Sequence, residues 1–308
     1  MKKVCCYICG SDKGDILFKQ EGHDPYLAKV HEPAPDFDLN WMICNECGFV
    51  YRSPALTDNE LDVLYKSYDQ DVFLNTTPDD YFDKIISLSS DESENWQKIS
   101  WLKEVISNLE RKDIFDALDI GCGGGTLLYT AREQLSLKKV SGVELNEVYA
   151  DLARKRLDAE VLNKDYVSGL FKNQFDLIIN TKVLEHVPDP YPFLKEMYGD
   201  LKQGGLLFIE VPDVSDMYSL PPTHERFWIP HVYFFSANTL GVLLKKVGFK
   251  IVANRVIKTH RDRSYLQFVA EKSKEILDDI STKPYEDIDS MKKLISQNLK
   301  NHNKKKVS

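Results

Sequence analysis

The sequence predicts an α/β fold in which a doubly wound sheet of seven strands follows a small N-terminal metal-binding module. A glycine-rich turn, Asp119-Ile-Gly-Cys-Gly-Gly-Gly-Thr126, lies between a strand-like apolar run and a helix-like apolar run. This order is typical of the first turn of such a sheet. Further strand-like and helix-like runs alternate after it. Five of the six cysteines precede the sheet, within the first 47 residues.

Composition narrows the class of protein. With 43% hydrophobic and 29% charged residues, the 308-residue chain has room for one large and one small domain. No run approaches the roughly 20 apolar residues of a membrane span, and the start lacks the apolar stretch of a secretory signal. We therefore expect a cytoplasmic protein. A formal charge of −8 disfavours nucleic acid as a partner. The oligomeric state is not predictable from these features.

Two Cys-x-x-Cys pairs, Cys6/Cys9 and Cys44/Cys47, are separated by 34 residues. Four thiolates from two such pairs can surround a zinc ion tetrahedrally, and a zinc ion with four protein ligands has no open position for catalysis. We therefore expect a structural Zn²⁺ site that stabilises a module too short for a core of its own. A redox dithiol is the main alternative, although one pair would suffice for it.

The segment between the two cysteine pairs is rich in proline and acidic residues, which predicts an irregular loop. His23 and His31 lie in this segment and are weaker alternative metal ligands. Cys5, directly before the first pair, is expected to be a spectator thiol.

A helix is expected directly after the module, because Thr57 and Glu60 have capping-box spacing. The acidic and polar stretch that follows, up to residue 94, is interpreted either as a lid over the cofactor crevice or as a linker. Apolar residues between Trp96 and Leu109 then recur with helical spacing and predict the helix before the first strand of the sheet.

The residues around the glycines indicate which kind of cofactor binds. Asp119 ends the first strand, and its carboxylate suits a cationic amino group better than a pyrophosphate. Thr126 replaces the third glycine of a dinucleotide fingerprint. Glu144 ends the second strand, where a carboxylate can accept the protons of both ribose hydroxyls. A nucleoside cofactor other than NAD is therefore predicted.

These residues resemble the S-adenosylmethionine (SAM) site of class I methyltransferases. The resemblance covers about residues 95–272 and implies a seven-stranded Rossmann-like class I methyltransferase sheet behind a small N-terminal zinc-binding module. Its further elements are Asp165 after strand three, 175–180 as strand four, Leu184-Glu-His-Val-Pro188, and 201–210 as strand five. The implied SAM contacts are the main chain of Gly121, Gly123 and Gly125, with Asp119 at the methionine end, Glu144 at the ribose and Asp165 near the adenine.

The last two strands, 248–253 and 264–270, are close in the chain, which predicts an antiparallel hairpin at one sheet edge. We expect a zinc-binding module over 1–56, a connecting helix and lid or linker over 57–94, the methyltransferase domain over 95–272 and a charged, helical tail over 273–308. The basic tail is expected to be mostly solvated, with contact to a partner or a lipid surface as the alternative.

Methyl transfer requires near-attack geometry, and a hydroxyl acceptor or an acidic carbon also requires a base. The candidate catalytic residues are His186 and His231, which follow strands four and five, where ligands of open α/β sheets bind. A structural histidine is the alternative at position 186, and an aromatic plug over the sheet edge is the alternative for 227–236. His224 is a weaker third candidate.

A closer resemblance concerns the acceptor. Cys47-Gly-Phe-Val-Tyr-Arg-Ser-Pro54 and His231-Val-Tyr-Phe-Phe-Ser236, in a class I protein with a four-cysteine module, are similar to motifs in methyltransferases of surface-polysaccharide and deoxysugar biosynthesis. This implies a sugar, nucleotide-sugar or glycan-precursor acceptor. In the sugar C-methyltransferases a glutamate precedes the histidine, but Pro230 stands here, so O-methylation is preferred. Sugar C-methylation, a noncatalytic SAM-binding zinc scaffold and an NAD-linked oxidoreductase are the alternatives.

Overall fold

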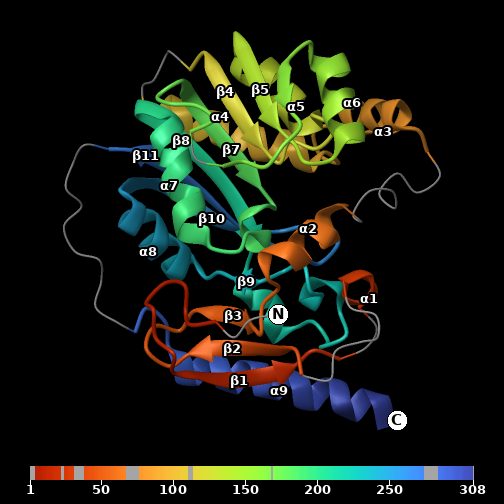
Figure 1. Ribbon diagram of the computed structural model, residues 1–308, viewed down its shortest axis with the longest axis vertical. Helices are drawn as coiled ribbons and strands as arrows, with labels where there is room; N and C mark the ends of the chain where they lie inside the picture. Colours follow the sequence, from red (N-terminus) through yellow and green to blue (C-terminus); the bar gives the residue numbers. More distant parts are fainter. Residues whose placement is uncertain are drawn as a thin grey trace.

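The computed structural model of the chain describes residues 4–21, 24–30, 38–66, 76–109, 114–167, 169–273 and 284–307. Two sheets organise the molecule, a large one of seven strands and a smaller one of four (Figure 1). In Figure 1 the small sheet lies below the large one, and the C-terminal helix α9 runs along its outer side.

The large sheet has the strand order β10-β11-β8-β7-β4-β5-β6. β4 to β8 pair in parallel, whereas β11 is antiparallel to both β8 and β10. The predicted seven-stranded mixed sheet with an antiparallel edge hairpin is therefore confirmed. Its strands are β4 (Asp116–Ile120), β5 (Lys139–Val143), β6 (Glu160–Leu162), β7 (Phe175–Thr181), β8 (Leu201–Pro212), β10 (Phe249–Lys258) and β11 (Ser264–Lys272).

Helices join these strands and begin at polar capping residues. The Ser93 side chain accepts a hydrogen bond from Trp96 N at the start of α4, and Ser236 forms a reciprocal capping box with Thr239 at the start of α8. The helices around the sheet are α4 (Glu94–Asn108), α5 (Thr126–Leu135), α6 (Glu147–Leu157), α7 (Pro190–Asp200) and α8 (Ala237–Val247). Short 3₁₀ turns follow β7 and β8, namely η2 (Leu184–His186), η3 (Val214–Tyr218) and η4 (Glu225–Phe227).

The small sheet has the order β1-β2-β3-β9, with β1 (Gly14–Lys19), β2 (Asn40–Cys44), β3 (Val50–Ser53) and β9 (Tyr233–Phe234). All of its pairings are antiparallel. The prediction of an irregular loop between the cysteine pairs is therefore wrong, because that segment contains β1, α1 (Pro25–Val30) and the start of β2. Burial explains the difference, since Phe18 and Trp41 insert into an apolar cluster that also includes Met291 and Ile295 of α9 (Ile288–Val307).

Between β3 and α4 the chain forms two more helices, α2 (Asp58–Lys66) and α3 (Pro78–Ile86), and α3 packs against α5 and α6. One half of the predicted capping box is present at the start of α2, because the Glu60 carboxylate accepts from Thr57 N at 2.7 Å and also from Thr57 Oγ1 at 2.7 Å. The predicted lid or linker falls partly on residues 67–75, which lie outside the described residues. His23 and His31 also lie outside them.

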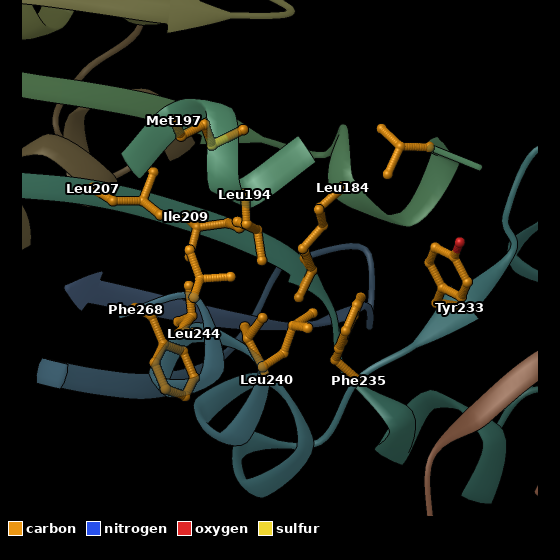
Figure 2. Close-up of a cluster of buried hydrophobic side chains, with 14 of the residues drawn as sticks. Leu184, Leu194, Met197, Leu207, Ile209, Tyr233, Phe235, Leu240, Leu244 and Phe268 are labelled. Atoms are coloured by element: carbon orange, nitrogen blue, oxygen red, sulfur yellow. The ribbon is translucent and has the colours of Figure 1, made fainter. Parts of the chain in front are cut away.

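Buried apolar side chains fix the segments that follow β7 and β8. Figure 2 shows Leu184 of η2, Phe235 after β9 and Leu240 of α8 gathered beside Ile209 of β8. Leu184, Phe235 and Leu240 are 0% exposed. Because each flanks a polar segment at the sheet edge, this packing determines where the neighbouring polar side chains lie. Among the described residues, no helix is both long and apolar enough to cross a membrane.

Candidate functional site

The four cysteines of the two Cys-x-x-Cys pairs come together in the folded chain. Their sulfur atoms lie within 4.8 Å of one another, with Cys6 Sγ 3.5 Å from Cys47 Sγ and Cys9 Sγ 3.5 Å from Cys44 Sγ. A tetrahedron built on Zn–S bonds of about 2.3 Å has edges of about 3.8 Å, so the donor set fits a zinc ion. Cys5 is exposed and is not part of the cluster.

The glycine-rich turn joins β4 to α5, and its backbone leaves space where a side chain would otherwise stand. Gly123 has φ +52°, and an added Cβ there would meet no atom within 4 Å. Gly121 has φ +76°, and its added Cβ would lie 2.4 Å from Val183 Cγ2. Gly125, with φ +85°, packs against α6. The bare main chain at Gly123 fits the close approach of a ligand.

Asp119 lies in β4, next to this turn, and is 2% exposed. Its Oδ1 is buried without a hydrogen-bond partner among the described residues. Burial, together with the nearby Glu144 carboxylate, raises the pKa of Asp119 to about 7, although the Lys98 ammonium opposes the shift. An unpartnered buried carboxylate oxygen fits a ligand that carries a cationic donor.

Glu144 follows β5 and lies against the glycine turn. Its two oxygens accept hydrogen bonds from Gly123 N and Asn146 N, each at 2.8 Å. Burial raises the pKa of Glu144, and the backbone donors oppose that shift. Gly121, Gly123, Asp119 and Glu144 therefore belong to one neighbourhood, whereas Asp165 is exposed beyond β6.

A pocket of about 340 Å³ opens beyond the ends of β7 and β8. Its lining includes the polar residues Lys182, Glu185, His186, Arg226 and His231, and the rings of Tyr26, Trp228 and Tyr265. The pocket is adjacent to the glycine turn, because Val183, between Lys182 and η2, is the residue that an added Cβ at Gly121 would strike. This position suits a methyl acceptor that faces a bound cofactor.

The two histidines predicted from the sequence meet in this pocket, and Glu185 lies with them. The ring centroids of His186 and His231 are 4.9 Å apart, and ligand atoms of all three residues lie within 4.8 Å of one another. His186 Nδ1 donates to the Pro230 carbonyl at 2.8 Å. In a neutral ring this leaves the lone pair on Nε2, which is 3.8 Å from Glu185 Oε1.

Burial sets the protonation of this group. It lowers the pKa of His231 well below its usual value, and the charges of His186 and Arg226 act in the same direction. His231 Nδ1 has no partner among the described residues. Glu185 is 1% exposed, and burial raises the pKa of its carboxyl. A neutral imidazole with a free lone pair can accept a proton or a hydrogen bond from an acceptor hydroxyl.

Sequence reasoning missed the part of Glu185. The sequence has Pro230, not a glutamate, directly before His231. In the folded chain Glu185 of η2 lies beside that histidine instead. Its position three residues before Pro188 was visible in the sequence, but its approach to His231 depends on tertiary packing. His224, the third candidate, does not line the pocket. Its Nδ1 accepts from Arg226 N and so caps η4.

Comparison of the chain with known proteins shows which proteins it resembles. Residues 79–254, more than half of the chain, match the family model described as a methyltransferase domain. A ubiquinone biosynthesis O-methyltransferase of Coxiella burnetii is 36% identical over 97 residues, covering 30% of this chain and 41% of that protein. One of Stutzerimonas stutzeri is 30% identical over 118 residues, covering 36% and 48%. The chain thus matches less than half the length of these relatives.

Among solved structures, the SAM-dependent methyltransferase of Aquifex aeolicus is similar, with a TM-score of 0.46 and 21% identity. The similarity covers 63% of this chain and 98% of that one.

The predicted sugar, nucleotide-sugar or glycan-precursor acceptor, and with it a role in polysaccharide biosynthesis, is contradicted by these relatives, which are named for ubiquinone biosynthesis. The structure supplies a physical reason. Phe227, Tyr233, Phe234 and Phe235 of this aromatic segment are 0–1% exposed. Phe227 and Phe234 pack in the cluster of the small sheet and α9, and Tyr233 and Phe235 pack in the cluster that includes the large sheet. These rings therefore serve packing.

The glycine turn, the acid after the second strand and the edge hairpin agree with the family match, which confirms the prediction of a methyltransferase domain over that of an NAD-linked enzyme. The chain belongs to the family of methyltransferase domains.

Proposed function

We propose that this protein is a SAM-dependent O-methyltransferase whose acceptor is a hydroxyl group on a small aromatic molecule. The observation that carries the proposal is the meeting of Glu185, His186 and His231 in one pocket beside the glycine turn. The names of the curated relatives support O-methylation. The rings of Tyr26, Trp228 and Tyr265 in the pocket wall support a flat acceptor.

SAM would bind along the glycine turn, with its cationic amino group at Asp119 and its ribose hydroxyls at Glu144, and Asp165 stays a candidate for the adenine side. When bound, it supplies a methyl group activated by the sulfonium. The bare main chain of Gly121, Gly123 and Gly125 allows this close approach. Asp119 and Glu144 would neutralise and orient the ligand through charge-assisted hydrogen bonds.

His186 would be the base. Its Nδ1 is engaged by the Pro230 carbonyl, so Nε2 would take the proton of the acceptor hydroxyl while that oxygen receives the methyl group, and S-adenosylhomocysteine would be the leaving group. Glu185 would stabilise the imidazolium that results, because its carboxyl lies 3.8 Å from Nε2. His231 is half-buried and its pKa lies well below the usual value, so its neutral ring would hold the acceptor oxygen through the unpartnered Nδ1.

We also propose that Cys6, Cys9, Cys44 and Cys47 bind one Zn²⁺. The supporting observation is the spacing of the four sulfur atoms. Because all four positions around the ion would be filled by protein, its contribution would be to folding, not to the transfer reaction.

The test is transfer of label from methyl-labelled SAM to a panel of phenols and catechols, with their methyl ethers as blanks. We expect transfer only to free hydroxyl groups. His186→Gln should lower kcat by about 10²- to 10⁴-fold, the usual contribution of a general base. His260→Gln, an exposed histidine in the β10–β11 turn, is the control and should not change kcat. Binding of SAM without transfer to any hydroxyl would refute the proposal.

A further inference from the structure

Arg52 of β3 is fully buried between the N-terminal module and the pocket. Its Nε donates to the His231 carbonyl at 3.1 Å, and Nη2 donates to the carbonyls of Phe227 and of Trp228. Its guanidinium also lies 4.6 Å from the ring centroid of Trp41. One side chain of the module thus binds three carbonyls of the 227–231 loop, which carries the pocket histidine.

Asp24 holds the same loop from a second point. Its Oδ2 accepts a hydrogen bond from Ile229 N at 2.6 Å. Gln20 joins the two anchors, because its amide donates to Asp24 Oδ2 at 2.8 Å while its Oε1 accepts from Arg52 Nη1 at 2.7 Å. Arg52, Gln20 and Asp24 therefore form one polar network around the backbone of the loop.

The other side of the loop faces the proposed base. The Pro230 carbonyl accepts the Nδ1 hydrogen of His186, and Val232 N donates to the Glu185 carbonyl at 2.8 Å. A displacement of the loop would therefore change which nitrogen of His186 carries the proton, as well as the position of His231. Since near-attack geometry is lost with shifts of about 1 Å, with costs near 100-fold, the anchors of this loop matter for the reaction.

Burying the charged guanidinium of Arg52 costs desolvation free energy, which packing alone would not require. Burial lowers the pKa of its guanidinium to about 9, and only Asp24 opposes that shift. An apolar side chain at this place could fill the same volume without desolvating a charge. What an apolar side chain could not do is bind three carbonyls at fixed angles, for which the planar guanidinium is suited.

We propose that Arg52 and Asp24 are positioning residues of the reaction, which set the tautomer of His186 and the place of His231 through the backbone of the 227–231 loop. This deepens the proposed function, since it assigns the N-terminal module a part in the same pocket. It predicts that altering the anchors changes the histidines while leaving cofactor binding intact.

The test compares Arg52→Lys and Asp24→Asn with the wild-type full-length protein. Arg52→Lys keeps the charge but loses the planar fork, and Asp24→Asn keeps the shape but loses the charge. Arg132→Lys is the matched control, because Arg132 also lies over a ring, that of Tyr129 at 5.5 Å, and donates to the Leu157 carbonyl at 2.7 Å. Imidazole nitrogen NMR, assigned with single His→Gln variants, reports the tautomer of each histidine.

In the wild type we expect one neutral tautomer of His186, with the proton on Nδ1. Both anchor variants should show a second tautomer of His186 and a shifted His231 signal, with the affinity for S-adenosylhomocysteine within twofold of the wild type. Arg132→Lys should show the wild-type signals. If Arg52→Lys fails to fold, Asp24→Asn decides the question. Unchanged histidine signals in a folded anchor variant would overturn the proposal.

This readout needs no acceptor, so it is separate from the test of the proposed function. Shifted histidine signals in a protein that transfers no methyl group would support the anchoring and refute O-methylation. Methyl transfer to a hydroxyl group together with unchanged histidine signals in a folded anchor variant would support O-methylation and refute the anchoring.

Discussion

The cofactor edge and the acceptor pocket of this protein are built in different ways. The cofactor edge consists of turns that follow neighbouring parallel strands, with Gly121 to Gly125 after β4 and Glu144 after β5. The acceptor pocket draws on α1, η2, the loop after η4 and β11. The first depends on local backbone geometry, whereas the second exists only when distant segments pack together. Changes in the N-terminal module should therefore damage one and spare the other.

The largest effect expected from this difference follows loss of the four-cysteine cluster. Cys44→Ser removes one of the four thiolates, and a structural zinc ion can contribute on the order of 10 kcal/mol to folding. We expect the module to lose its cooperative unfolding and the pocket to open, while S-adenosylhomocysteine still binds to the glycine turn. Calorimetric unfolding with and without a chelator measures the first effect, and titration measures the second. Cys5→Ser, outside the cluster, is the control.

If Cys44→Ser abolished cofactor binding and pocket formation together, the two regions would not be independent. The contrast between them would then be wrong.

The second effect is confined to the cofactor edge and depends on pH. The pKa of Asp119 is raised to about 7 in the folded protein, above its unfolded value of about 3.9. The folded state therefore binds a proton that the unfolded state lacks, and the free energy of unfolding should fall as pH rises from about 4 to about 7. A ligand with a cationic amino group needs the ionised carboxylate, so SAM affinity should fall about tenfold per pH unit below pH 7.

Calorimetric titration between about pH 5 and about pH 8 measures this dependence. Asp119→Asn should bind SAM more weakly at high pH and should flatten the profile, apart from the part due to Glu144, whose pKa is also raised. An Asp119→Asn profile as steep as that of the wild type would show that another group titrates.

The smallest expected effect separates two glycines within one turn. Gly123→Ala adds a methyl group to open space, so we expect weaker SAM binding, by roughly tenfold, with a stability cost of only about 1 kcal/mol from its positive φ. Gly125→Ala would bring Cβ to 2.8 Å from Leu157 Cδ1 and 3.1 Å from Ala153 Cβ, so its main effect should be on the free energy of unfolding. Denaturant titration and SAM titration of both variants measure the two quantities. Equal losses of affinity at equal stability would contradict the distinction.

The sequence was sufficient for the large sheet because each strand and turn carries its own signal. Asp119, the glycines and Glu144 lie in short stretches whose backbone geometry is determined locally. The small sheet was missed, since Val50 and Tyr51 of β3 pair with the distant Phe234 and Tyr233 of β9 only in the folded chain. For the same reason Glu185 was not associated with His231, and Arg52 and Asp24 gave no signal. The acceptor was mispredicted from a motif whose aromatic residues serve packing.

The pairing of β9 with β3 has a consequence for engineering. The fourth strand of the small sheet is a two-residue stretch, Tyr233–Phe234, that belongs to the part of the chain matched by the methyltransferase domain. A chimera that exchanged only the N-terminal segment with that of a relative would have to recognise a foreign edge strand or leave β3 unpaired, exposing it to association with other chains. Any functional exchange of modules must therefore carry this distant dipeptide along with the cysteines.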